Sequence, residues 1–239
     1  MMNEHTAKAF DVDLQDLARS VAEMGGLAEK QIADAVTSLV KRDGRLAQAV
    51  IAADPAIDTL QREIEEHAVL TIARRQPMAV DLRDIVGALR VSNDLERIGD
   101  LAKNIAKRVV ALGSDLQPHK VIRGVEHMSD LVLSQLKDVL DAYARRDLAK
   151  ALDVWRGDEE IDAVNNSLFR EFLTYMMEDP RTITFCTHLL FCAKNIERMG
   201  DHATNIAETQ NYIVEGRALA DERPKGDDTG FAKLLSPQG

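Results

Sequence analysis

Residues 96–109 of this chain read ERIGDLAKNIAKRV, and residues 197–210 read ERMGDHATNIAETQ. Eight of these fourteen positions are identical, and half of the identical residues carry charged or amide side chains. A duplicated core requires only apolar residues at a helical period, so the repeated Glu-x-x-x-Asp pattern indicates a chemical role as well. The chain is therefore predicted to contain two copies of one unit.

The repeat continues upstream of this motif. At an offset of 104 residues, Arg42-Asp43 recurs as Arg146-Asp147, and Asp54-x-x-Ile57-Asp58 recurs as Asp158-x-x-Ile161-Asp162. The later motif repeats at an offset of 101. A unit of about a hundred residues is too long for a short solenoid repeat and is typical of a tandem duplication of a small domain.

Apolar residues recur at helical spacing through nearly the whole chain, and no alternating stretch indicates a strand. The pattern predicts an all-α fold, a tandem duplication of a three-helix bundle with six long helices related by a pseudo-twofold axis. The second helix of each unit is expected over 46–75 and 148–178, followed by breaks at Pro77 and at Asp179-Pro180. The predicted units are 6–112 and 119–215, and the polar residues 216–239 are predicted to form a disordered tail.

Composition narrows the partners and the compartment. The net charge of −10 argues against nucleic acid and suits cations or basic protein partners, although an acidic surface also serves solubility alone. Cys186 and Cys192 form no Cys-x-x-Cys pair, which indicates buried thiols in a reducing compartment. The first ten residues hold no apolar signal region, and no stretch is long enough to span a membrane. We therefore expect a cytoplasmic protein.

The repeated carboxylates are predicted to meet. Counted outward from Pro77, Asp58 and Glu96 are both 19 residues away, and Asp54 and Asp100 are both 23 away. Equal counts on antiparallel helices mean equal heights, about 28 Å from the turn at the standard helical rise. The second unit shows nearly the same counts around Pro180. Each unit should therefore carry four carboxylates at one level, two on each helix.

The same geometry leaves two interpretations open. The angular positions on the helix place these carboxylates on the polar side, at the surface of the bundle. They could form a solvated acidic face that Arg97, Lys103 and Lys107 partly neutralise, or they could bind cations. Oxygen ligands favour Mg, Mn, Ca or Fe, with Zn less suitable. The surface position and the absence of any Glu-x-x-His pattern separate this chain from ferritin-like di-iron bundles.

At this point the residues resemble a known family. Two three-helix units, each with Asp-x-x-x-Asp followed by Glu-Arg-x-Gly-Asp and Asn-Ile-Ala, are similar to the PhoU family of phosphate-signalling regulators, over about residues 6–215. The resemblance implies a cytoplasmic homodimer without catalysis that represses the phosphate-starvation response. Its implied partners are the ATPase subunit of a phosphate ABC transporter and a sensor histidine kinase.

The resemblance also implies metal ions on the acidic motifs, with Fe, Zn, Mn or Mg as candidates. The implied ligands are Asp54, Asp58, Glu96 and Asp100 in the first unit, and Asp158, Asp162, Glu197 and Asp201 in the second. Four further residues are expected either to bind a partner protein or to support the metal ligands: Arg97, Asn104, Arg198 and Asn205. Asn195 stands where the first unit has Asp94, which implies a difference between the two sites.

Three hypotheses follow from the sequence. The first is a metal-binding adaptor between transporter and kinase. The second is a di-metal enzyme of the helical-bundle type, against which the missing histidine ligands count. The third is a metal-free helical scaffold whose carboxylates only face solvent.

Overall fold

The computed structural model describes residues 2–113 and 121–219. The first unit contains four helices: α1 (Met2–Lys41), α2 (Gly44–Ala53), α3 (Pro55–Arg75) and α4 (Val80–Leu112). The second contains α5 (Ile122–Arg145), α6 (Leu148–Arg156), α7 (Asp158–Glu178), the short 3₁₀ turn η2 (Pro180–Thr182) and α8 (Ile183–Glu215). No strand occurs in these two described ranges. The all-α duplicated bundle is confirmed.

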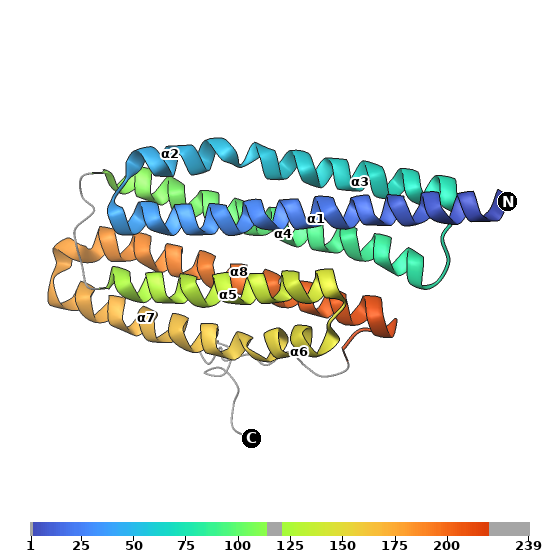
Figure 1. Ribbon diagram of the computed structural model, residues 1–239. Coiled ribbons are helices and arrows are strands. Elements are labelled where there is room, and N and C mark those ends of the chain that lie inside the picture. The colour runs from blue at the N-terminus through green and yellow to red at the C-terminus, as the bar shows by residue number, and fades with distance from the viewer. Residues whose placement is uncertain (1, 114–120, 220–239) are drawn as a thin grey trace, which may run out of the picture.

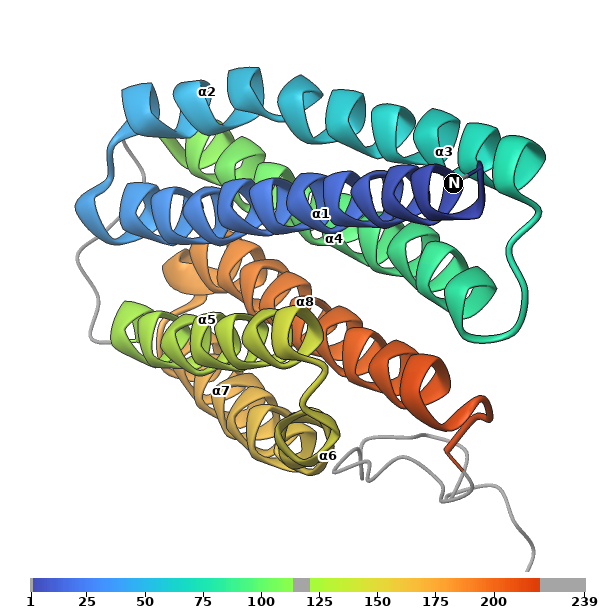
Figure 2. The same cartoon turned by 45° about the vertical axis from the view of Figure 1, so that its right-hand side comes forward.

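The helices form an elongated molecule in which the two units lie side by side (Figure 1). The α3–α4 turn and the α7–α8 turn lie at opposite ends, as a pseudo-twofold relation requires (Figure 1). The units meet through two helix pairs, α4 with α8 and α1 with α5 (Figure 2). Because α4 and α8 also contact the other helices of their own units, they are the central helices of the molecule.

The second long helix of each unit is interrupted, which differs from the continuous helices predicted over 46–75 and 148–178. The first break lies at Asp54, between α2 and α3, and the second lies at Gly157, between α6 and α7. Pro55 explains the first break, since it lacks the N–H that would continue the α2 ladder and suits the first turn of α3. Glycine weakens the helix at the second. Both breaks place the repeated aspartates at the start of a new helix.

The repeated Arg-Asp pair has a structural explanation. Arg42 and Arg146 adopt positive φ angles of 56° and 54° just after α1 and α5. The next residue caps the following helix: Asp43 accepts hydrogen bonds from the backbone of Arg45 and Leu46, and Asp147 does the same for Lys150. Side-chain caps of this kind stabilise a helix start by about 1 kcal/mol. These residues therefore repeat because they form the turn.

The hydrophobic core is continuous through both units and across the seam between them. Apolar side chains of α4 are buried on several faces of that helix, among them Ile85, Val91, Leu95, Ile98, Leu101 and Ile105. A helix that is buried nearly all round is expected at the centre of a larger assembly of helices. Burial of α4 and α8 thus decides the environment of the motif that both helices carry.

The two cysteines give a direct test of this core. Both thiols are free and buried, and burial raises the pKa of each, for Cys192 to about 12 despite the opposing charge of Arg108. At a pKa of about 12 only about one thiol in ten thousand is ionised at pH 8. We therefore expect iodoacetamide to modify neither cysteine readily in the folded protein, with Cys192 the slower of the two.

Mass spectrometry of the alkylated protein checks this prediction. Unfolding in urea should make both thiols react within minutes, because desolvation no longer suppresses the thiolate. Rapid modification of Cys192 before unfolding would contradict the close packing of α8.

Some predictions fall outside what the structure describes. The joint at 113–118 and the tail at 216–239 lie largely outside the described ranges, and the unit boundaries remain predictions. Along the helices of those ranges, none is long and apolar enough to cross a membrane.

Candidate metal centres

The break before α3 brings two aspartates against the middle of α4. Asp54 and Asp58 meet Glu96 and Asp100 there, and we call these four residues the first cluster. Asp54 is only 4% exposed, and the other three are partly buried. Burial raises the pKa of Glu96, and the charges of Asp100, Asp58 and Asp54 raise it further, against the lowering effect of Arg97. The four carboxylates are therefore close enough to interact, as the equal counts from Pro77 predicted.

A lysine lies inside the first cluster. Lys103 Nζ is 2.5 Å from Asp54 Oδ2 and 2.6 Å from Asp100 Oδ1, so its ammonium joins α3 to α4. Burial alone lowers the pKa of Lys103, but its hydrogen bonds to Asp100 and Asp54 and their charges outweigh burial and raise it above its ordinary value. The ammonium therefore stays charged at neutral pH.

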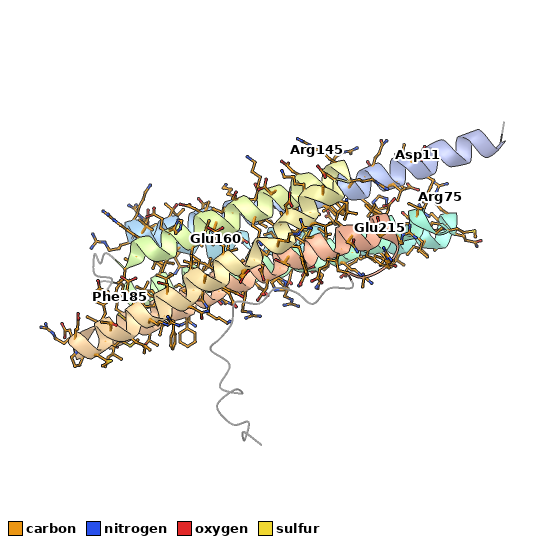
Figure 3. The ribbon with its side chains drawn as sticks, turned by 90° about the horizontal axis from the view of Figure 1, so that it is seen from below. Asp11, Arg75, Arg145, Glu160, Phe185 and Glu215 are labelled. Atoms are coloured by element: carbon orange, nitrogen blue, oxygen red, sulfur yellow. The ribbon has the colours of Figure 1, made fainter. Side chains whose placement is uncertain are left out.

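The second cluster consists of Asp158, Asp162, Glu197 and Asp201. Figure 3 shows Glu160, in the first turn of α7, near the middle of the molecule and far from Phe185 at the start of α8. Three members of the cluster are well buried, with exposed fractions of 3% for Asp158 and 8% for both Asp162 and Glu197. The cluster therefore lies between α7 and the centre of α8.

The supporting contacts of the second cluster differ from those of the first. Thr204 Oγ1 lies 3.0 Å from Asp158 Oδ1, and Gln135 Nε2 donates to Thr204 Oγ1 over 3.3 Å. Lys194 Nζ is 2.8 Å from Glu197 Oε1, but more than half of the lysine side chain is exposed. Burial raises the pKa of Glu197, and Asp201 and Asp162 add to it, while Lys194 opposes them.

The surface position expected for these carboxylates is wrong for four of the eight. Asp54, Asp158, Asp162 and Glu197 are buried. The expectation treated each helix by itself, whereas the second and third helices of each unit cover one another's polar flank and α8 covers α4. The carboxylates therefore lie between helices, where charge is harder to solvate.

The glycine of each motif makes room for a neighbouring helix. A Cβ at Gly99 would lie 2.9 Å from both Gln31 Oε1 and Ile57 Cδ1, and one at Gly200 would lie 3.0 Å from Ile161 Cδ1 and 3.3 Å from Gln135 Oε1. A neighbouring helix therefore packs closely against each glycine. Gln31 and Gln135 occupy equivalent positions at the 104-residue offset, and both are buried. The repeat could therefore have identified them as candidate site residues. Both amide atoms of Gln31 lack hydrogen-bond partners.

Of the four residues expected to support the clusters, Arg97 contacts the first cluster and Asn205 contacts the seam between the units. Arg97 is exposed and lies 3.3 Å from Asp100 Oδ2 and 3.1 Å from Glu96 Oε2, so it contacts the first cluster. Asn104 and Arg198 are exposed. Asn205 points to the seam between the units, where its Nδ2 donates to Asp94 Oδ1 over 3.2 Å.

Asp94 and His202 also belong to this seam. His202 Nδ1 lies 2.8 Å from Asp94 Oδ1, which links α4 to α8. The Asp94-to-Asn195 difference therefore concerns the seam and not the carboxylate cluster, contrary to what the resemblance implied. The sequence offered no signal for this pair, because the matching residue of His202 in the first unit is Leu101.

Carboxylate oxygens are suitable donors for a hard cation, but the side chains of the two clusters are not positioned to hold one. Within residues 2–113 and 121–219, no three His, Cys, Asp or Glu side chains are arranged to hold a metal ion. In the first cluster Lys103 stands between two of the four carboxylates. In the second cluster Lys194 Nζ contacts Glu197 Oε1. Neither cluster is arranged to hold a metal ion in this structure, although both supply oxygen donors of the type that hard cations bind.

Two equivalent units, each of three long helices with the second interrupted, and a carboxylate cluster between helices in each define a duplicated helical bundle. The family model described as "PhoU domain" matches residues 21–109 and 125–210. The chain belongs to the PhoU family.

Known members of the family agree over nearly the full length. The "Phosphate-specific transport system accessory protein PhoU homolog" of Rhizobium meliloti (strain 1021) is 58% identical over 229 residues, covering 96% of this chain and 97% of that protein. The crystal structure of PhoU from Pseudomonas aeruginosa is 40% identical, with a TM-score of 0.84 over 87% of this chain and all of that chain. The structure of "the phosphate transport system regulatory protein PhoU from Streptococcus pneumoniae" is 30% identical, with a TM-score of 0.82, covering 88% and 99% of the two chains.

Proposed function

We propose that this chain is a regulatory accessory protein of phosphate transport that represses the phosphate-starvation response when phosphate is plentiful. It does so as a cytoplasmic adaptor without catalysis of its own, binding the ATPase subunit of the phosphate ABC transporter and a sensor histidine kinase. The observation that carries this proposal is the 58% identity, over 96% of the chain, to a protein named as an accessory protein of phosphate-specific transport.

The physical properties of the chain support an adaptor role. The net charge of −10 favours basic protein surfaces as partners, and opposite charges accelerate the encounter of two proteins. Two equivalent units offer two related surfaces to two different partners. We also propose that the chain forms a homodimer, which light scattering of the purified protein would test.

Cation binding at the carboxylate clusters belongs to the same proposal. Fe, Zn, Mn and Mg are the candidates, and the oxygen-only donor set favours Mg and Mn. A bound ion would neutralise the buried carboxylates and hold α7 against α8. Elemental analysis of the protein as purified would identify the metal.

Deletion of the gene tests the regulatory role. We expect a deletion strain grown in high phosphate to express phosphate-scavenging genes, such as those for secreted phosphatases, at levels otherwise reached only under starvation. A plasmid carrying the wild-type gene should restore repression. If the phosphate-scavenging genes stay repressed in the deletion strain in high phosphate, the proposal is wrong.

A further inference from the structure

An apolar groove with a volume of about 440 Å³ lies between α7 and α8. Phe169, Leu190 and Phe191 supply its apolar lining, and Thr187 and Lys194 are among its polar lining residues. The side chains of Phe169 and Phe191 are large, yet they are 44% and 49% exposed. Large apolar side chains that are exposed together mark a surface that another segment or molecule covers.

The groove continues a stripe of side chains along one face of α8. The stripe consists of five residues, which we call the α8 stripe: Tyr212, Asn205, Arg198, Phe191 and Thr187. Successive members are seven or four residues apart, so at the standard helical turn angle they all lie within about 60° of one another. A chain segment that follows this stripe towards the start of α8 therefore arrives at the groove.

The chain turns back onto this stripe after α8 ends. Gly216 adopts a φ of 75°, and Asn211 Nδ2 donates a hydrogen bond to the backbone oxygen of Arg217 over 2.9 Å. Leu219 packs against the core and lines, together with Asn205 of the α8 stripe, a cavity of about 470 Å³. Residues 217–219 thus run back along α8, in the direction of the groove.

Twenty residues, 220–239, follow Leu219 in the sequence, and they are long enough to reach the groove. The large apolar residues among them are Phe231, Leu234 and Leu235. Phe231 is twelve residues beyond Leu219, which at full extension spans about 40 Å. Asn205 and Phe191 are fourteen residues apart on α8, or about 21 Å along the helix. The apolar residues of the tail can therefore lie against the groove without strain.

Charge favours the same path. Residues 220–230 contain four acidic and two basic side chains, which leaves a net charge of −2. Between Asn205 and the groove, α8 presents Arg198 and Lys194, and both are exposed. Opposite charges attract the acidic part of the tail to this part of the helix and fix its direction.

The size of the groove favours a segment of the same chain over a second protein. Seven residues line the groove, whereas a stable interface between two proteins uses about 20–30 residues on each side. A tethered segment needs less contact area, because the tether holds it at an effective concentration in the millimolar range.

We propose that residues 220–239 return along the α8 stripe and place Phe231, Leu234 and Leu235 in the groove between α7 and α8 of the same molecule. Burial of apolar surface drives this contact, and Arg198 and Lys194 guide the acidic residues before it. The contact does not depend on the proposed role in phosphate regulation. Any other protein that uses the groove has to displace the tail first, which lowers its apparent affinity.

Paramagnetic relaxation in the full-length protein tests the contact. A nitroxide label is attached at position 236 of the Ser236→Cys variant, and amide NMR signals are compared before and after the label is reduced with ascorbate. The buried Cys186 and Cys192 should take no label, which the same reaction on wild type checks. We expect the amide signals of Leu190 and Lys194 to lose most of their intensity while the label is oxidised.

Changes on either side of the contact should restore these signals. In the labelled background, Leu234→Ser combined with Leu235→Ser removes apolar side chains from the tail, and Phe169→Ala removes one from the groove. Either change should recover most of the lost intensity. Val69→Ala, at a position of α3 that is 62% exposed, is the control and should leave the signal loss unchanged. Circular dichroism establishes that each variant is folded.

Three results would overturn the proposal. The first is full intensity of the groove amides with the oxidised label, and the second is a signal loss that the tail variant does not change. The third comes from a mixture of spin-labelled chain without isotope enrichment and isotope-enriched chain without the label. An equal signal loss in that mixture would mean that the groove binds the tail of a second copy, and not that of its own chain.

Discussion

Replacing Phe172 with alanine is expected to lower the free energy of unfolding by about 3–5 kcal/mol. Phe172 lies on α7 and is completely buried among the core side chains of the second unit. Without the ring, the protein loses the favourable free energy of transferring it from water into the core. The substitution also leaves a cavity that the surrounding packed helices cannot fill. Urea denaturation, followed by the fluorescence of Trp155, measures the loss.

Phe169 provides the matched control because it lies three residues earlier on the same helix and is 44% exposed. Phe169→Ala should change the free energy of unfolding by no more than about 0.5 kcal/mol, as expected for a surface position. Equal losses from the two substitutions would mean that α7 does not pack against the core with the face that carries Phe172.

Lys103→Ala should be the next most damaging change, with a loss of about 2–3 kcal/mol at pH 8 in the absence of divalent ions. Removing one partner of a buried ion pair costs about 3–5 kcal/mol, and the partial exposure of Lys103 reduces that figure. The variant leaves Asp54 buried beside Asp100 without the ammonium that both contact. Lys107→Ala, one turn further along α4 and exposed, is the control and should be nearly neutral.

The cost of Lys103→Ala should depend on pH. Burial, followed by the charge of Asp100, already raises the pKa of Glu96. In the variant, the negative charges of Asp54 and Asp100 near Glu96 are no longer balanced by the ammonium that contacts both. A carboxyl whose pKa is higher in the folded state destabilises the protein above that pKa, and the penalty disappears below the pKa of the unfolded chain. The difference in Tm between wild type and variant should therefore narrow as the pH falls from 8 towards 4. A constant difference would show that lost packing, and not charge, explains the variant.

The regular part of the fold was predictable from local information. Apolar residues such as Leu17, Val21, Met24 and Ala28 repeat at the helical period in α1, and all are buried. The equal distances of Asp58 and Glu96 from Pro77 also led to the correct pairing of α3 with α4. Both inferences work because the rise and the turn angle of a helix are constant, so spacing along the sequence converts directly into position.

The candidate site was predictable in its members but not in its environment. The helix predicted over 46–75 is interrupted before Pro55, and the periodicity of the apolar residues does not reveal this break. Gln31 and Gln135 lie on the first helix of each unit, 65 and 62 residues before Glu96 and Glu197. Their equivalence in the repeat was visible, but their approach to Gly99 and Gly200 was not.

From the sequence alone it follows that the chain is two copies of a three-helix unit and that each copy gathers four carboxylates at one level, because repeats and helical spacing are properties of the chain itself. Only the tertiary structure decides that half of those carboxylates are buried, because burial depends on which helices cover them. The contact of Lys103 with Asp54, 49 residues earlier, is decided in the same way. A side chain that joins two helices is placed by their packing and by its rotamer, and neither is encoded in the spacing of residues along one helix.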